Sequence, residues 1–480
     1  MNIIEDIFLI VIDKLSNYEK LIFLLTDKHF SDTYKNKIIF RDAIDYKYIK
    51  YGNLIYTKYI NKFTTVVNIS DYDYIYKPNI KHEIDKSYGC ITHFMFRASL
   101  ICMPGFIPDT ITHLTFGDQF NELIVNCIPN SVTHLVFGFG FNQSITNSIP
   151  NSVTHIVFGY RFNKLKSGDL SDSVVDLTFG ICFNLRQNIL PKIKYLTFND
   201  NIFSINKNYI PSSVTHLTFS QDCTSNIDNS IPDSVTHLIL GPYFNIPIKN
   251  KALKFIRYLT FGKYFNQSIK NVIPNSVTCL TFGDDFNQPI TNAIPNSVIR
   301  LTFGKDFNQY ITNSIPNSVV RLTFGDAFNQ PITNSIPNSV KRLFFGKMFN
   351  QCIINNLSCS KNYRFSLLPN SLTHLIFGYR FNKSIINAIP NSVTHLVLGS
   401  NFNRSIDKAI PKFVTHLAFG KSFNKTIFNH IPDSVVTLTL GKIFNKSLHN
   451  CIPKSVTKIY LSTTYKYYES IPETIRIISY

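Results

Sequence analysis

The sequence contains no tryptophan and few of the features that mark an enzyme, a zinc protein or a membrane protein. It has no phosphate-cradling glycine-rich motif, no nucleophile elbow and no pair of acids set apart from its repeats, so an enzyme is the least favoured class. The nine cysteines include no C-x-x-C pair. A structural zinc site is therefore not indicated, and no cofactor is expected. No apolar run is long enough to span a bilayer.

Acidic residues are also scarce, 30 Asp and Glu against 48 Lys and Arg, which gives a net charge of +18. Such a charge is compatible with nucleic acid, but no dense basic run or nucleic-acid motif appears. Lysine is also the solvated residue that an AT-rich genome favours, so nucleic acid is not the favoured partner. Glu5 and Asp6 stand where a secretory segment carries positive charge. The sequence therefore predicts a cytoplasmic protein with reduced thiols.

One segment recurs along most of the chain. Its copies are spaced by 21 residues, as shown by Pro274, Pro295, Pro316 and Pro337. In the copy that opens at Ile273, Leu280 and Phe282 alternate with Cys279 and Thr281, which predicts a short strand with one face inward. A strand with one return cannot bury its own apolar side, so the copies must stack as a solenoid with parallel, in-register strands.

The rest of each copy fits the same interpretation. Gly283 ends the strand, Phe286 and Ile290 turn back into the core, and Pro274 belongs at a turn because it lacks an N–H. A recurring Asn is predicted to form an amide ladder that accepts from a backbone N–H and donates to a neighbouring carbonyl. This Asn column comprises Asn142, Asn163, Asn266, Asn287, Asn308, Asn329, Asn382, Asn403, Asn424 and Asn445.

The repeat closely resembles the FNIP repeat, a short relative of the leucine-rich repeat. Phe286-Asn287, Ile290 and Ile294-Pro295 carry the resemblance, which extends from Ile107 to about Pro472. It implies a mainly β, leucine-rich-repeat-like solenoid with one long parallel sheet. The family is abundant in social amoebae and in giant DNA viruses that infect amoebae. Its members are mostly of unassigned function, and some carry an N-terminal F-box.

Residues 1–40 are not repeat, and their apolar residues have helical spacing. Ile3-Ile4-Glu5-Asp6-Ile7 followed by the leucines of the next turns resembles an F-box, although the usual Leu-Pro and Cys-Lys-x-Trp motifs are missing. In that family these helices dock on a Skp1-type adaptor protein. The resemblance assigns this contact to Ile7, Val11, Leu15, Leu21, Leu24 and Leu25. The alternative is a helical cap on the solenoid.

The remaining boundaries follow from composition. Residues 41–106 are a Tyr- and Lys-rich linker and N-terminal cap, in which Thr92 to Phe96 already match the repeat strand. Residues 107–462 form the repeat solenoid, and 463–480 form its C-terminal cap. The spacer around 356–367 is either a surface loop or a decayed turn.

One outward strand position is the candidate partner-binding site. It holds His113, His134, His155, His216, His237, Arg300, Arg321, Arg342, His374, His395 and His416. Rings stacked on a flat sheet converge poorly on one tetrahedral metal, so no metal is assigned to them. Three adjacent arginines repel one another, and are either simply solvated or meet an acidic partner. Histidines on either side predict a face that becomes more positive below about pH 6.

These features favour a protein–protein interaction adaptor. The N-terminal helices would recruit a Skp1–cullin ubiquitin ligase, and the repeats would select an unknown, acidic protein substrate. The alternative is a non-catalytic scaffold, or a virion or host-interaction protein, without a ligase link.

Overall fold

The computed structural model describes the strand backbones of 43–45, 66–69 and 93–96, and residues 102, 104–105, 107–185, 189–199, 207–220, 227–228, 231–355 and 366–479. The chain divides into two compact units, unit 1 (1–219) and unit 2 (220–480). The boundary falls at the copy where Cys223-Thr224 replaces Phe-Asn. In the described parts, no helix has both the length and the apolar character that a bilayer crossing requires.

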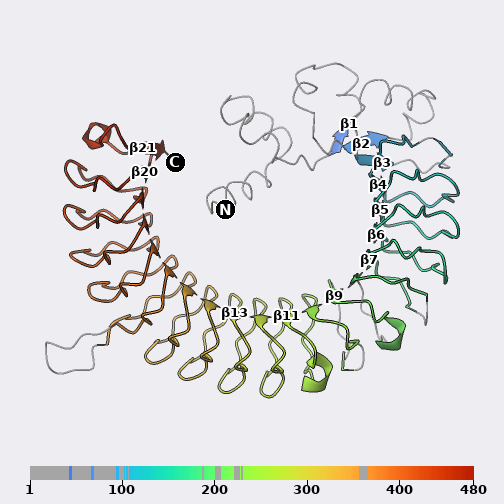
Figure 1. The fold of residues 1–480 in the computed structure, drawn as a ribbon, viewed down its shortest axis with the longest axis horizontal. Coiled ribbons are helices and arrows are strands. Elements are labelled where there is room, and N and C mark those ends of the chain that lie inside the picture. Colours follow the sequence, from blue (N-terminus) through green and yellow to red (C-terminus); the bar gives the residue numbers. More distant parts are fainter. Residues whose placement is uncertain are drawn as a thin grey trace. The chain divides into compact units, whose positions relative to one another are not determined.

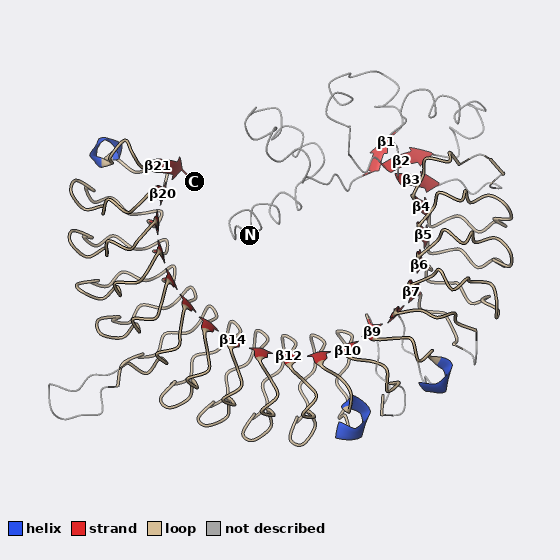
Figure 2. Cartoon of the chain, in the orientation of Figure 1, coloured by secondary structure: helices blue, strands red, loops and turns tan. Residues whose placement is uncertain are grey.

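Each unit contains a parallel sheet to which every copy contributes one short strand (Figure 1). The strands of unit 1 are β1 (Ala43–Asp45), β2 (Val66–Ile69), β3 (His93–Phe96), β4 (His113–Phe116), β5 (His134–Phe137), β6 (His155–Val157), β7 (Asp176–Phe179), β8 (Tyr195–Phe198) and β9 (His216–Phe219). The strands of unit 2 are β10 (His237–Ile239), β11 (Tyr258–Thr260), β12 (Cys279–Thr281), β13 (Arg300–Thr302), β14 (Arg321–Thr323), β15 (Arg342–Phe344), β16 (His374–Ile376), β17 (His395–Val397), β18 (His416–Ala418), β19 (Thr437–Thr439), β20 (Lys458–Leu461) and β21 (Arg476–Ser479). Short 3₁₀ helices lie at Lys207–Tyr209, Asn250–Leu253 and Tyr468–Ser470 (Figure 2).

The strands pair in the predicted register. Arg300 pairs with Arg321, Leu301 with Leu322, and the same offset repeats through the neighbouring pairs of unit 2. In unit 1, β1 to β3 pair in parallel ahead of β4. The sheet of unit 1 therefore begins well before Ile107. The mainly β, parallel solenoid is confirmed for the described part of the chain.

The core is a set of continuous apolar columns. Leu280 and Phe282 are 1% and 3% exposed, and Phe286 and Ile290 are completely buried, while Cys279 and Thr281 face outward. Successive return phenylalanines stack at 6.1–6.2 Å between ring centroids. Because each ring contacts its equivalents in both neighbouring copies, the fold gains its stability between copies rather than within one.

The Asn column forms a ladder, but only half of its predicted bonding is found. The Oδ1 of Asn287 accepts from the backbone N–H of Asn308, 2.9 Å away, and the same bond recurs from copy to copy. The donor to the neighbouring carbonyl is instead the next residue. Gln309 Nε2 lies 3.0 Å from the backbone oxygen of Asn287. The amide that was expected to donate from the Asn column is therefore supplied by the Gln column.

A second Asn column lies two residues before each Ile-Pro and adopts left-handed backbone angles. Asn292, Asn313 and Asn334 have φ values of 55°, 53° and 52°. Among non-glycine residues, Asn tolerates this region best because its short side chain can bond locally. This column therefore makes the turn that carries the return back to the next strand.

The copies lie closer together at the strands than at the returns. In unit 2 the distance between ring centroids of adjacent copies grows from the sheet face outward. It is 4.2–4.3 Å for the stacked histidines of the sheet face, 5.4–5.7 Å for the strand phenylalanines and 6.1–6.2 Å for the return phenylalanines. Each copy is therefore a wedge. Stacked wedges curve unit 2 into an arc with strands β10–β21 on the inner side and the returns on the outer side (Figures 1 and 2).

Candidate protein-binding face of the sheet

The candidate column occupies the first position of each strand and points out of the core. In unit 1 it places His113, His134 and His155 on adjacent strands, with His216 further along. In unit 2, Arg300, Arg321 and Arg342 are adjacent and are followed directly by His374, His395 and His416, while His237 begins β10. None of these side chains is buried.

The histidines stack into short rows. The rings of His113 and His134 lie 4.1 Å apart and those of His134 and His155 lie 4.2 Å apart, with interplanar angles of 13° and 8°. His374, His395 and His416 repeat the arrangement at 4.2 and 4.3 Å. Among the described residues, no group of three or more His, Cys, Asp or Glu has a metal-binding arrangement.

A threonine holds each of these rings in place. The hydroxyl of Thr394 lies 2.9 Å from Nδ1 of His395 and 3.2 Å from the backbone oxygen of Thr373. A hydroxyl has one proton, and the carbonyl can only accept it. This arrangement favours the tautomer in which His395 Nδ1–H donates to Thr394 Oγ1, which leaves Nε2 as an acceptor on the sheet surface.

Burial and neighbouring charges lower the pKa of several of these rings. Desolvation, with the adjacent histidines, lowers the pKa of His134 and of His395 to about 4. Desolvation and the Arg342 guanidinium lower the pKa of His374, and desolvation and Lys458 lower that of His416. The expectation that the rings become cationic just below pH 6 is therefore wrong for His134 and His395.

The arginine block differs from the histidine rows in charge and in exposure. Arg300, Arg321 and Arg342 are exposed, and no described Asp or Glu forms an ion pair with any of them. The Arg321 guanidinium lies 5.1 Å from the ring centroid of Phe344, within cation–π range. Three permanent charges of this face therefore lie side by side at β13–β15.

The sequence interpretation missed the residues that flank this block. Ile299 is 45% exposed, Val320 is half-exposed and Lys341 is exposed, and they form a row just before the arginines. A signal for them was present in the sequence, because each column histidine of the repeats follows a threonine, whereas each arginine follows Ile299, Val320 or Lys341.

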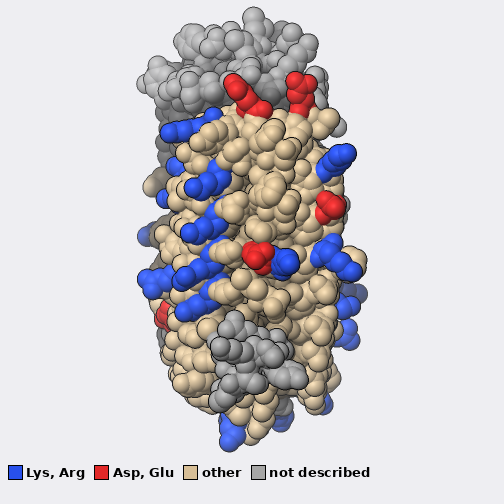
Figure 3. Space-filling view, turned by 90° about the vertical axis from the view of Figure 1, so that its left-hand side faces the viewer, with Lys and Arg blue, Asp and Glu red and all other residues tan. Residues whose placement is uncertain are grey.

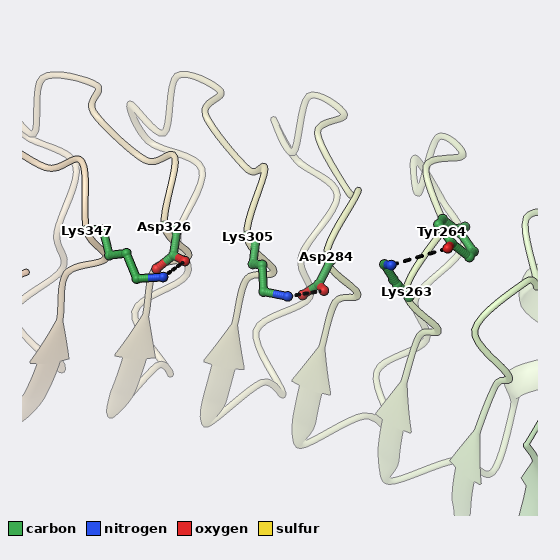
Figure 4. A network of polar contacts seen from close by, with 6 residues as sticks. All are labelled: Lys263, Tyr264, Asp284, Lys305, Asp326 and Lys347. Carbon is green, nitrogen blue, oxygen red and sulfur yellow. Dashed lines mark hydrogen bonds and ion pairs between the residues drawn. The ribbon is translucent and has the colours of Figure 1, made fainter.

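Another row of charges in unit 2 is largely neutralised in place. The residue after the strand glycine alternates in sign through Lys263, Asp284, Lys305, Asp326 and Lys347 (Figure 4). Lys305 Nζ lies 2.5 Å from Asp284 Oδ2, and Lys347 Nζ lies 2.6 Å from Asp326 Oδ2. This row is self-complementary between copies, which the arginine block is not.

A second basic row lies on the returns of the later copies. Lys383, Arg404, Lys425 and Lys446 stand where earlier copies have Gln288, Gln309 and Gln330. We call these four residues the return row. The space-filling view of this part of unit 2 also shows Lys and Arg side chains gathered along one side (Figure 3).

The FNIP Repeat family matches nine segments of the chain. The matched residues are 103–140, 141–180, 184–222, 225–253, 254–285, 286–327, 328–357, 364–401 and 402–442. The chain belongs to the FNIP repeat family. In the Phe-Asn pair of each copy, the Phe is thus the return ring buried in the core, and the Asn is the ladder amide that accepts from the next copy.

A solved structure with a leucine-rich-repeat fold is similar to this chain. The giant-virus protein CroV588, described as a novel circular LRR protein, is 41% identical with a TM-score of 0.66, over 82% of the FNIP chain and 60% of its own. The FNIP chain therefore spans about 60% of that relative's length. YopM from Yersinia enterocolitica is 13% identical with a TM-score of 0.40, over 81% of this chain and 85% of its own. A comparison with curated proteins gave no significant match.

Repeat solenoids that resemble leucine-rich-repeat proteins are typically non-catalytic scaffolds. Two predicted features lie outside the described residues. They are the F-box-like residues Ile7, Val11, Leu15, Leu21, Leu24 and Leu25, and residues 356–365 of the spacer.

Proposed function

We propose that this FNIP protein is an adaptor whose sheet face holds a protein partner at β13–β15. The observation that carries the proposal is the arginine block, which has three exposed guanidinium groups on adjacent strands without a carboxylate partner among the described residues. Like charges in a row favour an acidic surface that neutralises them, and paired guanidinium–carboxylate contacts are among the strongest polar contacts available to a protein.

We further propose that residues 1–40 recruit a Skp1-type adaptor, which would make the protein the substrate-recognition subunit of a cullin ubiquitin ligase. The support is the F-box resemblance and its position ahead of FNIP repeats, a pairing known in the family. In this proposal, the apolar residues of 1–40 bind the ligase and the sheet face selects the substrate. The alternative is a scaffold or host-interaction protein in which these residues serve only the solenoid.

Two matched variants test the sheet-face proposal. The sheet-face variant carries Arg300→Gln, Arg321→Gln and Arg342→Gln, and the return-row variant carries Lys383→Gln, Arg404→Gln and Lys425→Gln. Both lose three charges, and Gln is the natural residue of the return row in other copies. In affinity capture from amoebal lysate, we expect proteins held by the wild type and by the return-row variant to be lost from the sheet-face variant. Equal recovery by all three would refute the proposed binding face.

A second variant tests the ligase link. Leu21→Asp with Leu24→Asp should abolish capture of a purified Skp1-type protein, because a buried carboxylate is costly in an apolar interface. The sheet-face variant should still capture it. If the wild type recovers no Skp1-type protein under gentle conditions, the ligase proposal fails while the sheet-face proposal stands.

A further inference from the structure

We infer that the partner presents an acidic α-helix that lies across strands β13–β15, with its axis along the stack of copies. The inference rests on the proposed function and specifies the partner's shape. It follows from the spacing of the arginines, from the exposed apolar side chains beside them and from the absence of a competing acid among the described residues.

The spacing of the three arginines distinguishes a helical partner from an extended one. Adjacent strands lie about 4.8 Å apart, so Arg300 and Arg342 stand about 10 Å apart at the backbone. The copies converge on this face, because the rings of His374 and His395 in the same column are 4.2 Å apart. Three guanidinium groups therefore extend over roughly 8–10 Å.

A helix matches this interval. It rises about 1.5 Å per residue, so carboxylates at i, i+3 and i+7 stand at about 0, 4.5 and 10.5 Å along one side. In an extended peptide, same-face residues are about 6.7 Å apart, and the third would stand about 13 Å from the first. The extended peptide would miss one arginine by several ångströms, whereas the helix meets all three.

The neighbouring rows suit the flanks of a helix. Ile299 is 45% exposed on one side of the arginines, and Phe344 is half-exposed on the other side, where its ring already contacts Arg321. A helix is about 10–12 Å wide, so one seated on the arginines also covers these two rows. The matching partner is therefore amphipathic, with acids along one line and apolar side chains beside it.

The row of alternating charges from Lys263 to Lys347 shows how the arginine block differs from other charged rows. Lys305 and Lys347 each have an aspartate from the preceding copy, so an acidic helix there would have to displace an existing ion pair. The return row offers charge, but its copies stand farther apart, with core rings at 6.1–6.2 Å. Of these three rows of described residues, the arginine block is the one that combines close spacing, permanent charge and exposed apolar neighbours.

Fluorescence anisotropy with labelled synthetic peptides tests the inference. The facial probe is an Ala/Gln/Leu helix of about 16 residues with Glu at i, i+3 and i+7 and Leu beside them. The spread probe has the same composition with the acids around all sides. The broken probe has two prolines that prevent the helix. An oligothymidylate of equal charge tests for nucleic acid.

We expect the facial probe to bind the wild type and the return-row variant alike. The sheet-face variant should bind it at least about tenfold more weakly, since three charge-assisted contacts are lost. Equal binding of the spread or broken probe would show that charge alone is recognised and would overturn the inference. Preferential binding of oligothymidylate, or binding of no peptide, would overturn it as well.

These results remain distinguishable from a failure of the proposed function. If no peptide binds while lysate capture still depends on the arginines, the partner is not a helix but the sheet face is still the binding face. If capture is independent of the arginines, the proposed function itself fails. Unfolding midpoints of both variants should match the wild type, since all six side chains are on the surface.

Discussion

At the residue scale, each surface column is governed by whether its members have partners in their own chain. A histidine of the rows has a threonine on Nδ1 and another ring on its face, so its position is fixed by its own chain. An arginine in the same column has no threonine before it, and no Asp or Glu of the described residues forms an ion pair with it. One position of the repeat thus provides a structural element in some copies and a free charge in others.

The histidine rows predict an acid-sensitive solenoid. The folded pKa values of His134 and His395, about 4, lie below the ordinary value of 6.5, so the unfolded chain binds more protons between these limits. The stability from the neutral rings is complete above about pH 6.5 and is lost as the pH falls toward 4. Urea unfolding of the wild type should show this loss. His134→Thr with His395→Thr should flatten it, whereas His449→Gln, at an exposed site, should not.

The glycine column predicts a sharp steric requirement. A Cβ at Gly304 would overlap the carbonyl oxygen of Gly283 in the preceding copy, while a Cβ at Gly168 would meet nothing within 4 Å. Gly304→Ala should therefore lower the free energy of unfolding by about 3 kcal/mol or more, because the copies must separate. Gly168→Ala should cost only about 1 kcal/mol, for its positive φ. Similar unfolding free energies for the two variants would contradict this account.

At the scale of the element, each turn is completed by its neighbour. The Oδ1 of Asn308 accepts from the backbone N–H of Asn329 at 2.9 Å and from Gln330 Nε2 at 3.1 Å. The Ser318 hydroxyl likewise donates to the carbonyl of Val298 in the preceding copy at 2.7 Å. The polar groups of one return are satisfied by the next copy, so a single return has no independent stability.

Removal of one ladder amide should therefore destabilise the next copy as well as its own. Asn308→Ala leaves the N–H of Asn329 without its acceptor, and we expect a loss of about 1–3 kcal/mol in unfolding free energy. Asn296→Ala provides the control, because Asn296 is exposed and should change stability by less than about 0.5 kcal/mol. Chemical denaturation measures both. Equal, small effects would show that the ladder is not stabilising.

At the scale of the whole molecule, the period of 21 residues makes the chain modular. Deletion of residues 294–314 removes one copy, and Leu280 should then pair with Leu322 in the same register. We expect this protein to fold and to unfold cooperatively. Deletion of residues 294–303 breaks the period, so inward positions of later copies no longer meet, and misfolding is expected. Circular dichroism and denaturation distinguish the two deletions.

The sequence alone determined the repeat, its parallel register and the inward columns. These depend on short-range alternation and on a fixed period, which a single chain displays directly. It also located the arginine block, because a departure from a regular column is visible without coordinates.

Only the tertiary structure decided what each column touches. The bond from the Thr394 hydroxyl to the carbonyl of Thr373, the bond from Gln309 to the backbone oxygen of Asn287 and the close approach at Gly304 all involve distances between copies. The lowered histidine pKa values and the curvature within unit 2 have the same origin. They arise from how tightly neighbouring copies pack, and the repeat pattern of one copy carries no measure of that distance.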